Sequence, residues 1–247
     1  MNFSDQRYYA PYPDSSYLDG AYSVLPFCAH LLVLDLPLAN STKAMLDDLW
    51  LQFSLLYSHC YDASSSLLVH GYSPSRSPVW ANPNTGASPY VWGRALGWYT
   101  IGLVETLELM SFSSAIKGSP QYANILGMFI SICEAVVKAA DVTTGAWWQI
   151  MTLPNHTGNY LESSVTSHFT YTLLKGLRLG FLQNTQQINY VDVALKAYHY
   201  MDDVFVTHYP NGTLGFGATV GSCGLNSSAS YRVCCCFLKK NNVIPGG

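Results

Sequence analysis

Apolar residues recur every three or four positions along most of this chain, which is the spacing of an amphipathic helix. The clearest stripe follows a loop rich in proline and glycine, and it consists of Leu96, Tyr99, Leu103, Leu107 and Met110. The sustained alternation of apolar and polar residues that is typical of half-buried strands is absent. The pattern therefore predicts an all-α fold.

Six helices follow from this periodicity, over residues 16–34, 42–57, 94–110, 120–137, 161–182 and 187–205. Ser16 is a candidate N-cap for the first helix, with Asp19 at its third position as in a capping box. Ser119 followed by Pro120 is a typical start for the fourth helix. Two segments between helices resemble one another, residues 62–68 and 141–148, and this weak repetition indicates stacked αα-hairpins.

Candidate chemistry gathers between residues 68 and 110. Arg94 and Trp98 are four residues apart, so they share a helix face, and Trp92 comes just before them. A helix N-terminus carries partial positive charge, and an Arg and two indoles beside it would suit a ring that bears a carboxylate. The alternative is that Trp92 and Trp98 belong to the core and Arg94 caps a loop.

Composition narrows the class of protein. The chain has 247 residues, of which 49% are hydrophobic, enough for one substantial core. A net charge of −3 makes nucleic-acid binding improbable on electrostatic grounds. Aromatic residues make up 14% and charged residues only 11%, which suits a protein that handles neutral or weakly acidic sugars, or simply an aromatic-rich core.

The sequence says less about where the protein is located and whether it binds a cofactor. No run of 18 or more apolar residues is present, so we predict no membrane span, and residues 1–20 lack the apolar region of a signal peptide. Glycosylation motifs nevertheless favour an extracellular protein over a cytoplasmic one, and they begin at Asn2, Asn40, Asn155, Asn211 and Asn226. The seven cysteines show no zinc-binding spacing, so no metal or other cofactor is predicted.

Three motifs together resemble the signature of glycoside hydrolase families 88 and 105, the unsaturated glucuronyl and rhamnogalacturonyl hydrolases. They are His70-Gly71-Tyr72, Trp80-Ala81 and Trp92-Gly93-Arg94-x-x-Gly97-Trp98. The resemblance implies an (α/α)6 barrel, with twelve helices in two rings and the active site at one end of the inner ring. Because only six helices are predicted here, we expect an incomplete barrel, truncated at both ends.

The resemblance also divides the chain. It extends from about Tyr17 to Leu225, so we predict a partial barrel domain over residues 1–228. Residues 229–247 contain three consecutive cysteines and do not resemble the family. We interpret them as a divergent tail, either frame-shifted or mis-spliced, or a genuine disordered terminus.

By resemblance, Asp19 is the catalytic acid. It stands in Tyr17-Leu18-Asp19-Gly20-Ala21-Tyr22, where the family has an apolar residue, Asp, Gly and then Tyr. Desolvation between Tyr17 and Tyr22 would raise the pKa of this carboxyl toward that of a proton donor. A helix cap is the alternative role of Asp19. The family's second aspartate would match a segment upstream of Met1.

The implied substrate is an oligosaccharide ending in a C4=C5 unsaturated uronic acid, with pectin-derived rhamnogalacturonan disaccharides as the expected example. The acid protonates C4 and water adds at C5. His70, Trp92, Arg94 and Trp98 would then contact the sugar or its carboxylate, whereas Ser73 replaces an Asp that the family often has. A catalytically inactive carbohydrate-binding remnant is the alternative, and the oligomeric state is open, a monomer included.

A second matching segment begins at residue 161. It reads Leu161-Glu162-Ser163-Ser164 and continues through His168 to Arg178. Glu162 stands where a helix is predicted to begin, so we interpret it as a cap or as a carboxylate facing the helix dipole. His168 is interpreted as structural.

Overall fold

Seven α-helices form in the part of the chain that the computed structural model describes, residues 15–34 and 42–221. They are α1 (Ala21–Val33), α2 (Thr42–Cys60), α3 (Gly93–Met110), α4 (Ser114–Lys117), α5 (Pro120–Lys138), α6 (Ser163–Arg178) and α7 (Tyr190–Tyr200). A 3-10 turn (Leu18–Gly20) precedes α1, and a π-helical turn (Met201–Phe205) follows α7. The predicted helical fold is confirmed, and α4 is a short addition that periodicity could not reveal.

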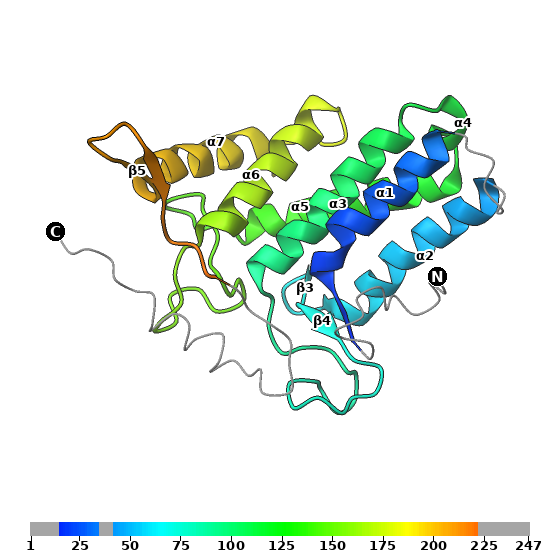
Figure 1. Cartoon of the computed structure of the whole chain (residues 1–247), viewed down its shortest axis with the longest axis horizontal. Coiled ribbons are helices and arrows are strands. Elements are labelled where there is room, and N and C mark those ends of the chain that lie inside the picture. The colour runs from blue at the N-terminus through cyan, green and yellow to red at the C-terminus, as the bar shows by residue number, and fades with distance from the viewer. Residues whose placement is uncertain (1–14, 35–41, 222–247) are drawn as a thin grey trace.

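The helices are arranged in two layers. α1, α3 and α6 lie side by side, while α2, α5 and α7 pack against their outer sides (Figure 1). Short connections make each outer helix antiparallel to the inner helix that precedes it, as the hairpin prediction requires. The N-termini of α1, α3 and α6 consequently all lie at one end of the molecule (Figure 1).

The predicted start of the first helix is wrong. Ser16 and Tyr17 form strand β1, and α1 begins only at Ala21 with Gly20 as its N-cap. No side chain caps either α1 or the preceding 3-10 turn, so the capping box proposed for Ser16 and Asp19 does not form. The cause is tertiary, because backbone pairing with a distant strand holds Ser16 and Tyr17 extended.

Strands occur in the described residues as three antiparallel pairs beside helix ends. β1 (Ser16–Tyr17) pairs with β4 (Gly71–Tyr72), and β2 (Tyr61–Asp62) pairs with β3 (Leu67–Leu68). β5 (Val206–His208) pairs with β6 (Leu214–Phe216) after the end of α7. Each strand is two or three residues long, so these pairs fix loops rather than form a layer.

One turn geometry recurs at Asp62, Asn82 and Asp141. At each position the side-chain Oδ1 accepts from the backbone N–H two residues later, and the backbone carbonyl accepts from the N–H four residues later. The residue four positions later has a positive φ, and it is Ser66, Gly86 and Gly145 respectively. The predicted similarity of residues 62–68 and 141–148 is thus confirmed, and the Asn82 turn is a third copy.

By length and composition alone, α5 could cross a bilayer, although the sequence contained no unbroken apolar run of that length. In the structure, α5 packs against α2 and α3 and buries one apolar side. Its buried residues include Ile125, Phe129, Ile132, Cys133 and Val136. This burial is that of a core helix.

The predicted tail 229–247 and the motifs at Asn2, Asn40 and Asn226 lie outside the described residues.

Candidate active site

Backbone pairing brings Asp19 beside His70. β1 and β4 pair with Tyr17 opposite Gly71, and the next N–H along, that of Leu18, donates to the carbonyl of His70 at 3.0 Å. The N–H of His70 donates in turn to the Tyr90 carbonyl. Asp19 follows one strand and His70 precedes the other, so two residues 51 positions apart are held face to face.

The side chains of Asp19 and His70 are hydrogen-bonded. The His70 Nε2 atom lies 3.0 Å from Asp19 Oδ2. The His70 side chain is buried, while about a quarter of the Asp19 side chain stays exposed. The helix-cap alternative for Asp19 is therefore excluded, since its carboxylate is engaged by a distant histidine and not by the N-terminus of α1. A partly exposed carboxyl group beside a buried imidazole is an arrangement suited to proton transfer.

Trp92 packs against the His70 member of this pair. Its ring centroid is 4.7 Å from that of His70, and the Arg94 guanidinium carbon lies 5.3 Å from the Trp92 ring centroid. Trp92 is only 4% exposed. It therefore supports His70 and Arg94 from below, and the structure offers no open indole face there for the predicted stacking on a sugar.

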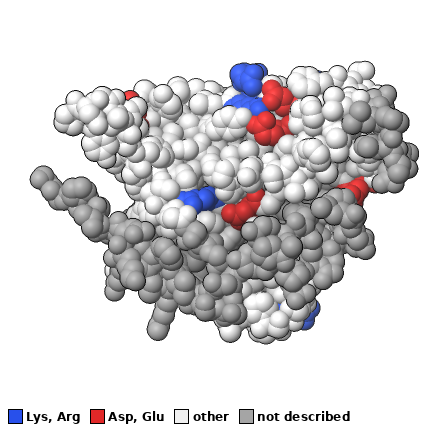
Figure 2. All heavy atoms as spheres, viewed as in Figure 1, with Lys and Arg blue, Asp and Glu red and all other residues white. Residues whose placement is uncertain are grey.

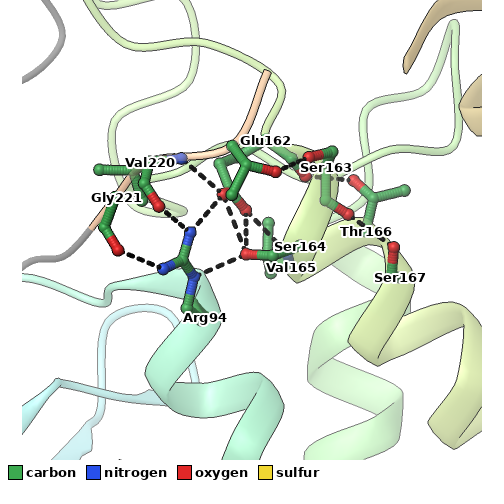
Figure 3. A network of polar contacts seen from close by, with 10 residues as sticks. Arg94, Glu162, Ser163, Ser164, Val165, Thr166, Ser167, Val220 and Gly221 are labelled. Carbon is green, nitrogen blue, oxygen red and sulfur yellow. Dashed lines mark hydrogen bonds and ion pairs between the residues drawn. The ribbon is translucent and has the colours of Figure 1, made fainter. Parts of the chain in front are cut away.

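Arg94 extends across the gap between α3 and α6 (Figure 3). Its Nε donates to Ser164 Oγ at 2.7 Å, and its Nη2 donates to Glu162 Oε1 at 2.9 Å. It also donates to the carbonyls of Val220 and Gly221. Four contacts within the described residues leave one of the five guanidinium N–H groups for a substrate. The predicted contact between Arg94 and a uronate carboxylate stays a prediction, limited to that group.

Glu162 is the carboxylate on which this network converges, and it is 1% exposed. As predicted, it caps α6, because Oε2 accepts from the N–H of Val165 at 2.7 Å. Its Oε1 also accepts from the Val220 N–H, and both oxygens accept from Ser164. The ion pair with Arg94 joins residues 68 positions apart, and no local pattern predicted it.

Trp98 lies between rings from the two neighbouring helices. Its ring centroid is 4.3 Å from that of Tyr22 on α1 and 4.1 Å from that of His168 on α6. Burial lowers the pKa of His168 to about 4, against smaller opposing effects from carboxylates that include Glu162 and Asp19. His168 is therefore neutral near pH 7, consistent with the structural role predicted for it. Together the rings of Tyr22, Trp98 and His168 form an aromatic row across the three inner helices.

The glycines of the Trp-Gly-Arg motif make this packing possible. A Cβ atom on Gly93 would lie 2.6 Å from Val165, and one on Gly97 would lie 2.6 Å from the His168 ring. Both contacts are with α6, because residues four apart share one helix face. The spacing of the motif therefore sets how closely α3 and α6 approach, a packing role that the sequence reading had not assigned.

The charges on the inner face are few and grouped. Figure 2 shows a mostly uncharged face, with one group of charges near the C-terminal ends of α3 and α6 and a smaller one near the N-terminal end of α3. The N-termini of α1, α3 and α6 lie near the smaller group of charges and add partial positive charge there. Within the described residues, no group of three or more His, Cys, Asp or Glu side chains could hold a metal ion.

A family model identifies the family of this chain, and similar proteins and structures are known. The model of Glycosyl Hydrolase Family 88 matches residues 6–234. Protein Atu3128 of Agrobacterium fabrum is 34% identical over 142 residues, which are 58% of each chain. A family 105 glycoside hydrolase of Clostridium acetobutylicum has a similar structure, with a TM-score of 0.80 and 27% identity over 93% of this chain and 60% of that one.

More distant solved structures share the fold alone. Unsaturated glucuronyl hydrolase from Bacillus sp. GL1 superimposes with a TM-score of 0.53 at 11% identity, covering 87% of this chain and 53% of that one. These neighbours are α/α toroids, so the predicted toroid architecture is confirmed. The chain spans about 58% of the length of the curated relative and 60% of the family 105 enzyme.

Proposed function

Because this chain belongs to glycosyl hydrolase family 88, we propose that it removes a C4=C5 unsaturated uronic acid from the end of a lyase-generated oligosaccharide. The observation that carries the proposal is the Asp19–His70 pair, with its partly exposed carboxyl at the shared N-terminal end of three inner helices. Pectin fragments such as unsaturated rhamnogalacturonan disaccharide are the substrates we propose to test first.

In the proposed reaction, Asp19 donates its proton to C4 of the vinyl ether. The double-bond electrons form the new C4–H bond, and positive charge develops at C5 and the ring oxygen. Water adds to C5 and loses a proton to the Asp19 carboxylate, which restores the acid. The resulting hemiketal opens and the rest of the oligosaccharide leaves as an alcohol. One carboxyl group thus serves as acid and then as base.

His70 is suited to hold Asp19 in both states. A neutral imidazole nitrogen can either donate or accept, depending on which nitrogen carries the hydrogen. At 3.0 Å, His70 Nε2 can accept from a protonated Asp19 or donate to the ionised form. Its ring packs against Trp92, and its backbone is held by hydrogen bonds with the backbone of Leu18 and Tyr90. His70 would therefore position Asp19 throughout the cycle.

The uronate carboxylate also has a plausible place. The N-termini of α1, α3 and α6 lie at the same end of the molecule, so their partial positive charges add there (Figure 1). The remaining N–H of Arg94 lies at the start of α3. An anionic sugar is therefore favoured over a neutral one at this end of the molecule.

The test is to replace Asp19 with Asn in the 247-residue chain and to follow the fall in ultraviolet absorbance as the C4=C5 bond disappears. We expect turnover to drop about 10²–10⁴-fold, the usual cost of losing a positioned general acid. Asp202→Asn, at an exposed position on the π-helical turn, is the matched control and should keep wild-type activity.

Binding measured in parallel separates this enzyme from a carbohydrate-binding remnant. Titration calorimetry with the unsaturated disaccharide should give similar affinities for wild type and Asp19→Asn, because Arg94 and the aromatic rings around the site are unchanged. Binding by the wild type without any turnover would support the inactive remnant, and equal turnover by Asp19→Asn would remove Asp19 from the mechanism.

A further inference from the structure

We propose that Tyr22 provides the aromatic face on which the sugar ring stacks, a role that neither tryptophan of the Trp-Gly-Arg motif can fill alone. The inference rests on the proposed function, since it names the surface that positions the unsaturated sugar beside Asp19. Pyranose rings bind proteins by laying their C–H face on an aromatic ring, which needs an exposed ring close to the reacting group.

Exposure selects Tyr22 from the aromatic rings around the site. Trp92 is 4% exposed and lies under His70 and Arg94. Trp98 is partly buried and already contacts two other rings. Tyr22 is 45% exposed. It therefore has the open surface that stacking requires, and the indole of Trp98 supports it.

Position along α1 places Tyr22 on the side of Asp19. Asp19 lies in the 3-10 turn that leads into α1, and Tyr22 follows three positions later in the first turn of the helix, a spacing that puts side chains on the same side. Tyr22 contacts the Trp98 ring, and Trp98 contacts the His168 ring. The row formed by Tyr22, Trp98 and His168 therefore begins one turn from Asp19.

Close helix packing fixes the Tyr22 ring over Trp98. A Cβ atom on Gly102 would lie 2.8 Å from the Ala21 carbonyl oxygen and 3.2 Å from the Tyr22 nitrogen. Gly102 comes one turn after Trp98 on α3, so the missing side chain lets the start of α1 lie directly against that turn. Gly97 admits His168 on the other side in the same way. The stacking surface is thus built before any sugar binds, which lowers the entropy cost of binding.

The experiment compares Tyr22→Ala, Tyr22→Phe and the wild type by initial rates on the unsaturated disaccharide. Stacking acts on the bound sugar and not on the proton, so we expect Tyr22→Ala to raise KM about tenfold with kcat changed less than about threefold. Tyr22→Phe keeps the ring and should restore KM to near the wild-type value. Tyr198→Ala is the matched control, because Tyr198 is 53% exposed on the outer helix α7.

Thermal melting of each variant shows whether Tyr22→Ala still folds. If it does not, Tyr22→Leu, which keeps apolar packing on Trp98 without an aromatic face, replaces it and should give the same rise in KM. A KM within twofold of wild type in the folded variant would overturn the proposal.

Absence of turnover in the wild type would contradict the proposed function instead. In that case calorimetric titration with the same disaccharide tests whether Tyr22 binds the sugar. Weaker binding by Tyr22→Ala, with binding by Tyr198→Ala unchanged, would support the stacking surface. Equal binding by wild type and Tyr22→Ala, or no binding by the wild type, would overturn it.

Discussion

Two ionic clusters join α3 to α6, one at each end, and they differ in what surrounds them. The Arg94 cluster, at the N-terminal ends, consists of Arg94, Glu162, Ser164 and the backbone of Val220. The Lys175 cluster, toward the C-terminal ends, consists of Lys175, Glu105, Glu108, Tyr171 and Arg178. Both cross-link the same two helices, so the comparison isolates the effect of the surroundings.

Burial separates the two clusters. In the Arg94 cluster the carboxylate is 1% exposed, and two backbone N–H groups, those of Val165 and Val220, depend on it. In the Lys175 cluster the cation is buried, but the side chains of Glu105 and Glu108 are about a quarter exposed. If an ion pair is broken, water can therefore solvate the carboxylates of the Lys175 cluster, but it can hardly reach Glu162. The same kind of ion pair should thus matter more at the site than away from it.

The largest effect is expected for Glu162→Ala. This change leaves the Arg94 guanidinium without a counter-charge and two backbone donors without an acceptor, so we expect unfolding to become easier by about 3–5 kcal/mol. Urea denaturation measures the loss. Glu162→Gln, which keeps an acceptor oxygen but not the charge, should lose less. Equal losses for the two variants would show that hydrogen bonding, and not charge, organises the cluster.

A smaller effect is expected for Lys175→Met. Removing this cation leaves Glu105 and Glu108 facing one another, but both retain solvent, so the expected loss is about 1–2 kcal/mol. The same denaturation experiment applies, with Lys117→Met at an exposed position as the control. A loss of stability as large as that of Glu162→Ala would contradict the argument that the more buried Arg94 cluster contributes more to stability than the Lys175 cluster.

Acid should distinguish the variants further. The hydrogen bond from Lys175, more than any other cause, holds the pKa of Glu108 below its ordinary value. A lowered carboxyl pKa contributes stability above the ordinary value, and this stability is lost as the pH falls through the folded-state pKa. The wild type should therefore lose this contribution on acidification, and Lys175→Met should already lack the part that comes from Lys175, while the part from Arg178 remains.

The smallest effect concerns His168, which lies between the two clusters on α6. Burial lowers its pKa to about 4 in the folded chain. As the pH falls, His168 is therefore protonated near pH 6.5 in the unfolded chain but only near pH 4 in the folded chain. Stability from this group is full above about pH 6.5 and falls as the pH drops toward 4. Between pH 7 and pH 5.5 we expect a loss of about 1 kcal/mol.

The measurement for His168 is the stability difference between pH 7 and pH 5.5 in wild type and in His168→Gln. Other groups titrate in both proteins, so the difference between the two curves isolates His168. An identical pH dependence would mean that protonated His168 is accommodated in the folded state. The result also tests whether the His168 end of the aromatic row excludes water.

Local features of the fold were predictable because their causes are local. Ser119 and Pro120 begin α5, and the Ser119 side chain accepts from Tyr122 as a cap should. The same logic failed at Ser16, where pairing with Tyr72 overrides the capping preference. The Asn82 turn was missed because no helix precedes it, although its side chain and hydrogen bonds match those at Asp141.

The site was predictable only in part. The spacing of the Trp-Gly-Arg motif located Arg94 and Trp98, and the family resemblance located Asp19 and His70. Periodicity could not show that Arg94 would meet Glu162, or that the motif's glycines make room for α6, because those contacts join separate hairpins. Exposure, which sets Tyr22 apart from Trp92, likewise depends on packing that no single segment encodes.

Arg94 also imposes an order on biosynthesis. Its carbonyl partners Val220 and Gly221 lie 126 and 127 positions later in the chain. At a translation rate of about 5–20 residues per second, they leave the ribosome roughly 6–25 s after Arg94. The first hairpins have ample time to fold within that interval, since helices and short loops close in microseconds to milliseconds. We therefore expect the first helices to fold before Val220 and Gly221 emerge, so that the hydrogen bonds of Arg94 are completed last.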